Sequence, residues 1–315
     1  MSPPSSTAPA AFPFASTRDP VRIEGLCFVA LAVEDPQRAA RFYRDVLGFA
    51  DDAGAALPRS GVHHVLRTPS GQRLVLCRFD GTPQPPDLGR HTGYGVTREA
   101  REAIVRRLQA GGVAVETYEE DRTAERADNV YFRDPDGNRI QLVIADRPGS
   151  IDHAGIQAID IEWEEDLFVG LLGLPVEEVF GWRTADYKRA ARWGEGLESM
   201  APGTRRWDRR YALRPGQGPM VARPNMQLFM RAGAQILGIF LAYERYQLPS
   251  DEQVAGIPRL GFAVAPGELA TIAARFAEGK LPTDGPHPHP ASSPYRESLY
   301  ARDRGGNFLE FCVAR

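Results

Sequence analysis

The chain has 315 residues, which suggests two domains of roughly 150 residues each. Hydrophobic residues make up 43% and charged residues 25%, as in ordinary globular proteins, and the net charge is −3. This balance argues against nucleic acid or an anionic membrane as a partner. No apolar run of about 18 residues occurs, so no membrane span is expected. Three cysteines without a CxxC pair predict free thiols and a cytoplasmic protein.

The first expected strand and helix follow an N-terminal tail. Residues 1–20 are rich in Pro, Ser and Ala and lack the basic start of a signal peptide, so we expect a disordered tail. Val29, Leu31 and Val33 then alternate as in a strand with one buried face. Asp35 is suited to cap a following helix, and Gly48 is suited to end it in a left-handed conformation.

A second strand–helix segment covers residues 91–112. Ala100, Ile104 and Leu108 share one face of its expected helix. Residues 129–144 then predict two strands joined by a tight Asp-Pro-Asp-Gly turn, in which glycine adopts a positive φ.

Both segments recur later in the chain. Residues 151–174 repeat residues 26–49, and residues 259–280 and 298–313 repeat the back half, with Leu269, Ile272 and Phe276 on one helical face. We therefore predict modules at 21–147 and 150–315, each built of two βαβββ units. The second module carries 44 additional residues at about 181–224.

The strand–Asp–helix–LGF opening and the Asp-Pro-Asp-Gly-Asn close resemble the vicinal oxygen chelate superfamily, which includes glyoxalase I, bleomycin-resistance proteins and extradiol dioxygenases. The resemblance covers nearly the whole chain except the tail and the insertion. It implies an α+β fold of tandem glyoxalase-like modules, each forming a curved mixed sheet around a cavity. It also implies a divalent metal ion held by residues on the first strand, at the start of the back half and on the last strand.

In the first module these three positions hold Phe28, His91 and Gln141. Phenylalanine cannot bind a metal, and an amide is a poor substitute for a carboxylate. This module by itself has an incomplete ligand set, and His91 is either a ligand or a polar residue at a strand start.

In the second module the three positions hold His153, Arg259 and Glu310. His153 and Glu310 match the ligand pattern, whereas arginine stays protonated and cannot ligate a cation. Arg259 could instead pair with Glu310 and replace the metal.

Some members of this superfamily exchange halves between modules. Exchange here would bring His153, His91 and Gln141 together and leave Phe28, Arg259 and Glu310 as the complementary set. The sequence does not choose between these pairings.

Other candidates lie outside the ligand positions. Tyr300 stands ten residues before Glu310, and His289 precedes it in a Pro-rich stretch. The resemblance to extradiol dioxygenases implies an acid–base role for His289 and a donor role for Tyr300, and a surface loop is the alternative. We also expect Arg259, Gln141 and insertion residues to contact the substrate, with the insertion acting as a lid or as a surface flap. Those insertion residues are Trp182, Trp193 and Trp207.

Three functions are consistent with these residues. The first is a ring-cleaving, extradiol-type dioxygenase with iron(II) acting on an aromatic or vicinal-oxygen substrate. The second is a glyoxalase- or epimerase-type isomerase or lyase with zinc, nickel, cobalt or manganese, which the exchanged set would favour. The third is a metal-free protein that binds a small molecule, as resistance proteins do. The resemblance leaves a homodimer open.

Overall fold

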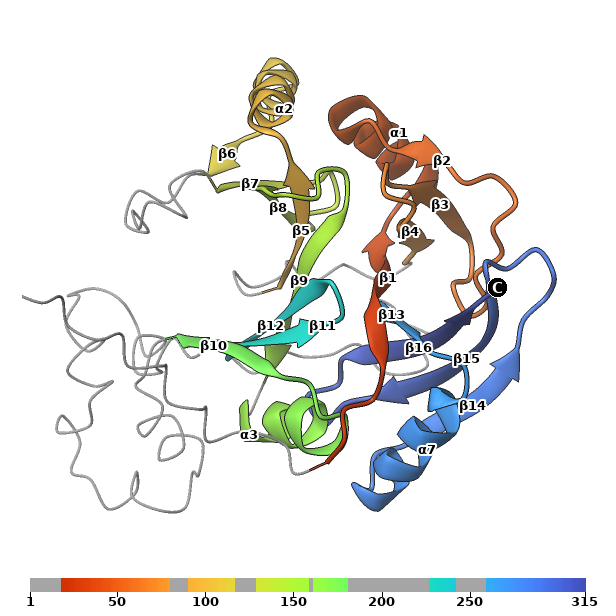
Figure 1. Ribbon diagram of the computed structural model, residues 1–315. Helices are drawn as coiled ribbons and strands as arrows, with labels where there is room; N and C mark the ends of the chain where they lie inside the picture. Colours follow the sequence, from red (N-terminus) through yellow and green to blue (C-terminus); the bar gives the residue numbers. More distant parts are fainter. Residues whose placement is uncertain (1–17, 80–89, 117–128, 159–160, 181–226, 242–258) are drawn as a thin grey trace, which may run out of the picture.

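The computed structural model describes residues 18–79, 90–116, 129–158, 161–180, 227–241 and 259–315. These residues form two mixed eight-stranded sheets with a few helices, which confirms the expected α+β fold of tandem glyoxalase-like units (Figure 1). Each sheet combines the front half of one module with the back half of the other. The halves are therefore exchanged, which settles the pairing that the sequence left open.

Sheet A has the strand order β14-β15-β16-β13-β1-β4-β3-β2. Strand β1 pairs antiparallel with β13 at the join, with Phe28 opposite Gly261. The bounds are β1 Ile23–Val33, β2 Ala50–Asp51, β3 His63–Arg67, β4 Arg73–Arg78, β13 Arg259–Val264, β14 Thr283–Pro288, β15 Tyr295–Arg302 and β16 Phe308–Ala314.

Sheet B has the order β10-β11-β12-β9-β5-β8-β7-β6. Strands β5 and β9 join its two halves, with Gly93 opposite His153. The bounds are β5 His91–Val96, β6 Val115–Glu116, β7 Val130–Arg133, β8 Arg139–Ile144, β9 Ile151–Ala158, β10 Val176–Phe180, β11 Gln227–Ala232 and β12 Gln235–Leu241.

The helices contact one another in pairs and pack against the hydrophobic core. Helix α1 (Pro36–Leu47) contacts α2 (Arg98–Ala110), and α7 (Glu268–Glu278) contacts the π-helix η2 (Glu165–Leu171), which continues α3 (Ile161–Glu164). Their buried residues join one face of each sheet in a single hydrophobic cluster. The opposite face of each sheet, here called its site face, carries the residues at the expected ligand positions.

The predicted helix caps of the first unit are confirmed. The side chain of Asp35 accepts hydrogen bonds from the backbone of Gln37 and Arg38, and Gly48 has φ 74°. The Asp-Pro-Asp-Gly turn has the expected glycine at positive φ, Gly137, and the equivalent turn of the later repeat has Gly306 at positive φ. Local sequence signals therefore define the ends of these elements correctly.

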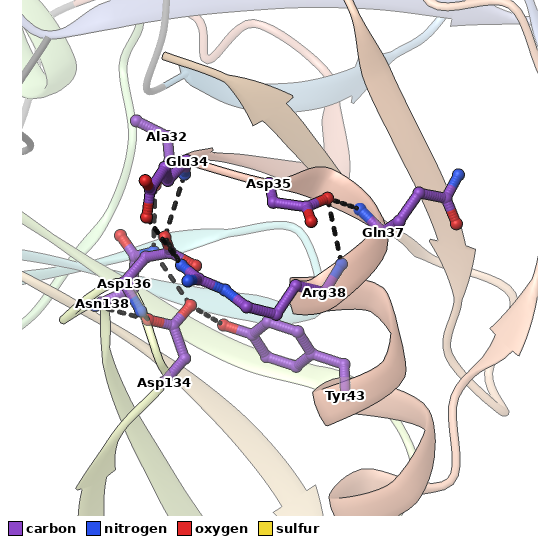
Figure 2. Close-up of polar contacts among 9 residues, drawn as sticks. All are labelled: Ala32, Glu34, Asp35, Gln37, Arg38, Tyr43, Asp134, Asp136 and Asn138. Carbon is purple, nitrogen blue, oxygen red and sulfur yellow. Dashed lines mark hydrogen bonds and ion pairs between the residues drawn. The ribbon is translucent and has the colours of Figure 1, made fainter. Parts of the chain in front are cut away.

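The turn between β7 and β8 of sheet B is hydrogen-bonded to strand β1 of sheet A (Figure 2). Asn138 donates from Nδ2 to the carbonyl oxygen of Ala32 at 3.2 Å and to Asp134 Oδ2 at 2.9 Å. The buried Asp134 also accepts the hydroxyl hydrogen of Tyr43 at 2.8 Å, and burial raises the pKa of this carboxyl. Arg38 adds an ion pair with Asp136 at 2.7 Å.

The equivalent turn of sheet A, between β15 and β16, is hydrogen-bonded to strand β9 of sheet B. Asn307 donates from Nδ2 to the carbonyl oxygen of Gln157 at 2.8 Å and to Asp303 Oδ2 at 2.7 Å. Burial raises the pKa of Asp303 to about 6. Each turn thus links the two halves of one module across the two sheets, and together they fix the strands that carry the site residues.

Candidate functional site

Three potential metal ligands meet on the site face of sheet B. His91 begins β5, Gln141 lies on β8 and His153 lies on β9. The Nε2 atom of His153 is 2.9 Å from Nε2 of His91 and 3.0 Å from Oε1 of Gln141. His91 and Gln141 come from the first module and His153 from the second, so exchange of the halves assembles this group.

A glycine creates the space in which the three side chains meet. Gly93 is in register with His153 on β9 and with Gln141 on β8. A Cβ atom at Gly93 would lie 2.1 Å from Cε1 of the His153 ring. The imidazole therefore lies directly over the backbone of β5, which a larger residue would prevent.

A bulge places a carboxylate beside His153. The pairing of β5 with β9 shifts at this point, because Gly93 faces His153 whereas the next residue, Tyr94, faces Ile151. The additional residue is Asp152, whose Oδ2 lies 2.8 Å from Nδ1 of His153. Bulges commonly redirect a side chain in this way. The contact with Asp152 orients the ring, and an Nδ1–H donated to Asp152 would leave Nε2 able to ligate a metal ion.

The donor set fits a divalent metal ion. Two ligands at about 2.1 Å from a tetrahedral zinc ion lie about 3.4 Å apart, so the donor atoms of His91 and Gln141, at 2.9 and 3.0 Å from His153 Nε2, would move only a few tenths of an ångström to hold an ion. Within the ranges that the structure describes, no group of three His, Cys, Asp or Glu side chains is arranged to hold a metal ion, and the third donor of this group is an amide. The donor set is neutral, because it consists of two imidazole nitrogens and one amide oxygen. It therefore suits zinc, nickel or cobalt better than ions that prefer carboxylate ligands.

Aromatic side chains surround His91. Its ring makes edge contacts with Tyr131 and Phe240, at centroid distances of 5.9 and 5.4 Å. Phe240 in turn packs edge-on against Phe229 at 5.6 Å. The Arg139 guanidinium lies 4.0 Å from the centre of the Tyr131 ring. These rings form an apolar wall that can hold a flat or aliphatic group next to the three donors.

The equivalent group in sheet A cannot hold a metal ion. Arg259 and Glu310 have side chains only 1% exposed, and Arg259 Nε lies 2.7 Å from Glu310 Oε2. Phe28 fills the position of His153, over Gly261 instead of Gly93. Arg259 also donates to Ser60 Oγ at 3.1 Å and lies 5.5 Å from the Phe28 ring centre. The expected alternative pairing of Arg259 with Glu310 is confirmed.

His289 and Tyr300 belong to this sheet A group and lie apart from the sheet B donors. His289 Nε2 is 2.8 Å from Ser298 Oγ and 3.9 Å from Glu310 Oε1, and burial lowers its pKa. Tyr300 is opposite Glu310 on the neighbouring strand, and burial raises the pKa of its phenol. Arg59 covers the Tyr300 ring at 4.3 Å.

The remaining expectations have mixed outcomes. Trp182, Trp193 and Trp207, with the whole predicted insertion, lie outside the described residues. Gly93 and Asp152 are not among the site residues expected from the sequence. The repeat indicates Gly93, because Gly261 occupies the corresponding place. Nothing in the local pattern indicates Asp152, because neighbouring strand residues normally point to opposite faces.

Known proteins share this fold. Residues 25–142 match the model of the Glyoxalase/Bleomycin resistance protein/Dioxygenase superfamily. A solved structure titled "putative dioxygenase" from Bacillus subtilis has a TM-score of 0.60 and 15% identity, and covers 93% of this chain and 86% of its own. Glyoxalase I from Zea mays has a TM-score of 0.57 and 12% identity, and covers 92% of both chains. At these identities the two structures support the fold alone. No helix in the described part of the chain has the length and apolar character needed to cross a membrane.

Proposed function

Because residues 25–142 belong to the Glyoxalase/Bleomycin resistance protein/Dioxygenase superfamily, we propose that the chain is a small-molecule enzyme whose metal centre is formed by His91, Gln141 and His153. The observation that carries the proposal is that His153 Nε2 lies 2.9 Å from His91 Nε2 and 3.0 Å from Gln141 Oε1, which brings donors from strands of both modules together. The substrate class is a small molecule with two neighbouring oxygens, and the reaction is an isomerisation or lyase step of the glyoxalase or epimerase type.

This reaction class is favoured over ring cleavage for two reasons. The extradiol hypothesis requires His153 to act with Glu310 and Tyr300, and the last two lie in sheet A. Iron(II) oxygenases typically use two histidines and a carboxylate, whereas the third donor here is the Gln141 amide. Zinc, nickel or cobalt is therefore the expected ion.

Each residue of the centre has a distinct task. A bound divalent ion would polarise the substrate oxygens as a Lewis acid. Asp152 holds the proton at Nδ1 of His153 and so fixes which nitrogen faces the centre. His91 and Gln141 complete the ligand set from the adjoining strands. Tyr131 and Phe240 pack around His91 and exclude water from one side of the bound substrate.

Calorimetric titration of zinc into chelator-treated protein tests the proposal. We expect one site per chain in the wild type, its loss in His91→Ala and His153→Ala, and its retention in His63→Ala, a histidine on β3 of sheet A. Oxygen uptake with catechols should be absent. Uptake that depends on added iron would revive the dioxygenase hypothesis. Small-molecule binding that is insensitive to chelator in a protein without a zinc site would favour metal-free binding.

A further inference from the structure

Gln157 carries a buried amide that the fold does not use. It lies on β9 four residues after His153, and the alternation of the strand places both on the site face. The residue is 4% exposed, and within the described part of the chain neither Nε2 nor Oε1 has a hydrogen-bond partner. Native proteins pair nearly all buried polar groups, so an unpaired amide calls for an explanation.

The fold itself requires no polar side chain at this position. The equivalent residue in the first module is Ala32, which packs against the hydrophobic cluster on the site face of sheet A. The backbone of Gln157 takes part in fastening the two sheets, because its carbonyl oxygen accepts from Asn307. That contact does not depend on the side chain. The amide is therefore suited to a ligand rather than to the scaffold.

We propose that Gln157 is a specificity-determining residue that binds the far end of an elongated substrate, through a neutral group that both donates and accepts hydrogen bonds, such as a carboxamide. This inference rests on the proposed function, because it takes the reacting end to lie at His153. Four residues along a strand separate the two contacts by about 13 Å. The substrate is therefore expected to be longer than a three-carbon compound.

The neighbouring side chains support this chemical class. Gln157 is in register with Phe240, and Phe240 packs against both His91 and Phe229. The segment between the two polar ends would thus lie against aromatic rings. A carboxylate would pair with the amide nitrogen but would face the lone pairs of the amide oxygen. A carboxamide satisfies both atoms.

Thermal melts of two matched variants provide the first test. Gln157→Leu replaces an unpaired amide with an apolar side chain of similar size, so its melting temperature should equal or exceed that of the wild type. Gln235→Leu is the control, because Gln235 is also buried, at 9% exposed, but accepts a hydrogen bond from Leu26 N at 3.0 Å, and it should melt lower. A drop for Gln157→Leu as large as for Gln235→Leu would show a structural role and overturn the inference.

Binding of two hydroxamates to the zinc-loaded protein provides the second test. Both probes chelate through two neighbouring oxygens. Suberic acid monohydroxamate monoamide ends in a carboxamide, and octanohydroxamate ends in a methyl group. Calorimetry should give the amide probe an affinity for the wild type about tenfold higher, a difference that Gln157→Leu abolishes without weakening octanohydroxamate.

The outcomes separate the inference from the proposed function. Equal affinities of the two probes for the wild type would overturn the role of Gln157 and leave the metal centre standing. A preference for the amide probe that persists in Gln157→Leu would assign the contact to another residue and also overturn the inference. Binding of neither probe would overturn the metal centre and, with it, the inference.

Discussion

The Arg259–Glu310 pair allows a sharp test of the claim that sheet A is metal-free. In Glu310→Gln the guanidinium stays buried but loses its carboxylate partner at 2.7 Å. Its neutral acceptors, Ser60 Oγ at 3.1 Å and Arg59 O at 3.3 Å, cannot offset a full charge. Breaking a buried ion pair from one side costs about 3–5 kcal/mol, and we expect that loss in the free energy of unfolding.

The matched control replaces both partners. Arg259→Met combined with Glu310→Leu removes both charges and keeps apolar volume, so the double variant should unfold within about 1 kcal/mol of the wild type. Urea unfolding at pH 7, followed by circular dichroism, measures both values, and zinc titration runs in parallel. The reasoning fails if Glu310→Gln costs less than about 1 kcal/mol, if the double variant is as unstable as the single one, or if Glu310→Gln loses the zinc site.

Two further predictions concern crowding and pH. Gly93→Ala and Gly261→Ala should each lower stability by about 1–3 kcal/mol, because each Cβ would lie 2.1 Å from a ring atom, of His153 and of Phe28. Zinc titration should show a lost site in Gly93→Ala alone, and equal zinc affinity in both would refute the placement of the centre. The folded-state pKa of Asp303, about 6, exceeds the unfolded value of 3.8. The protonated carboxyl therefore stabilises the folded state, and this contribution is fully present below about pH 4 and is lost as the pH rises to about 6. The difference in unfolding free energy between the wild type and Asp303→Asn should therefore fall between about pH 4 and 6 and stay constant at higher pH. Urea unfolding of both proteins at each pH measures this difference. A difference that does not change with pH would contradict the prediction.

Much of the fold was predictable because its signals are local. The Asp35 cap, the Gly48 helix end and the turns with Gly137 and Gly306 each depend on the conformational preference of a few adjacent residues. The internal repeat then identified both copies of each unit. The repeat also makes Gly261 and Gly93 equivalent. Each lies directly under an aromatic ring, of Phe28 and of His153, so the close contact at one glycine predicts the close contact at the other.

The pairing of the halves was not predictable from the repeat, because each strand carries a hydrophobic pattern that suits either partner. The choice depends on contacts between residues far apart in sequence, such as the pairing of Phe28 with Gly261 and of Gly93 with His153. The role of Asp152 depends on a bulge that forms only where β5 meets β9. The spare amide of Gln157 becomes visible only once its neighbours are placed.

We propose that the exchanged halves build one metal centre, in sheet B. The most direct measurement is an anomalous difference map, recorded at the zinc edge from crystals soaked in zinc. We expect one strong peak per chain at about 2.1 Å from Nε2 of both His91 and His153. A peak beside Glu310, or zinc bound only at surface residues with none between the two histidines, would contradict it.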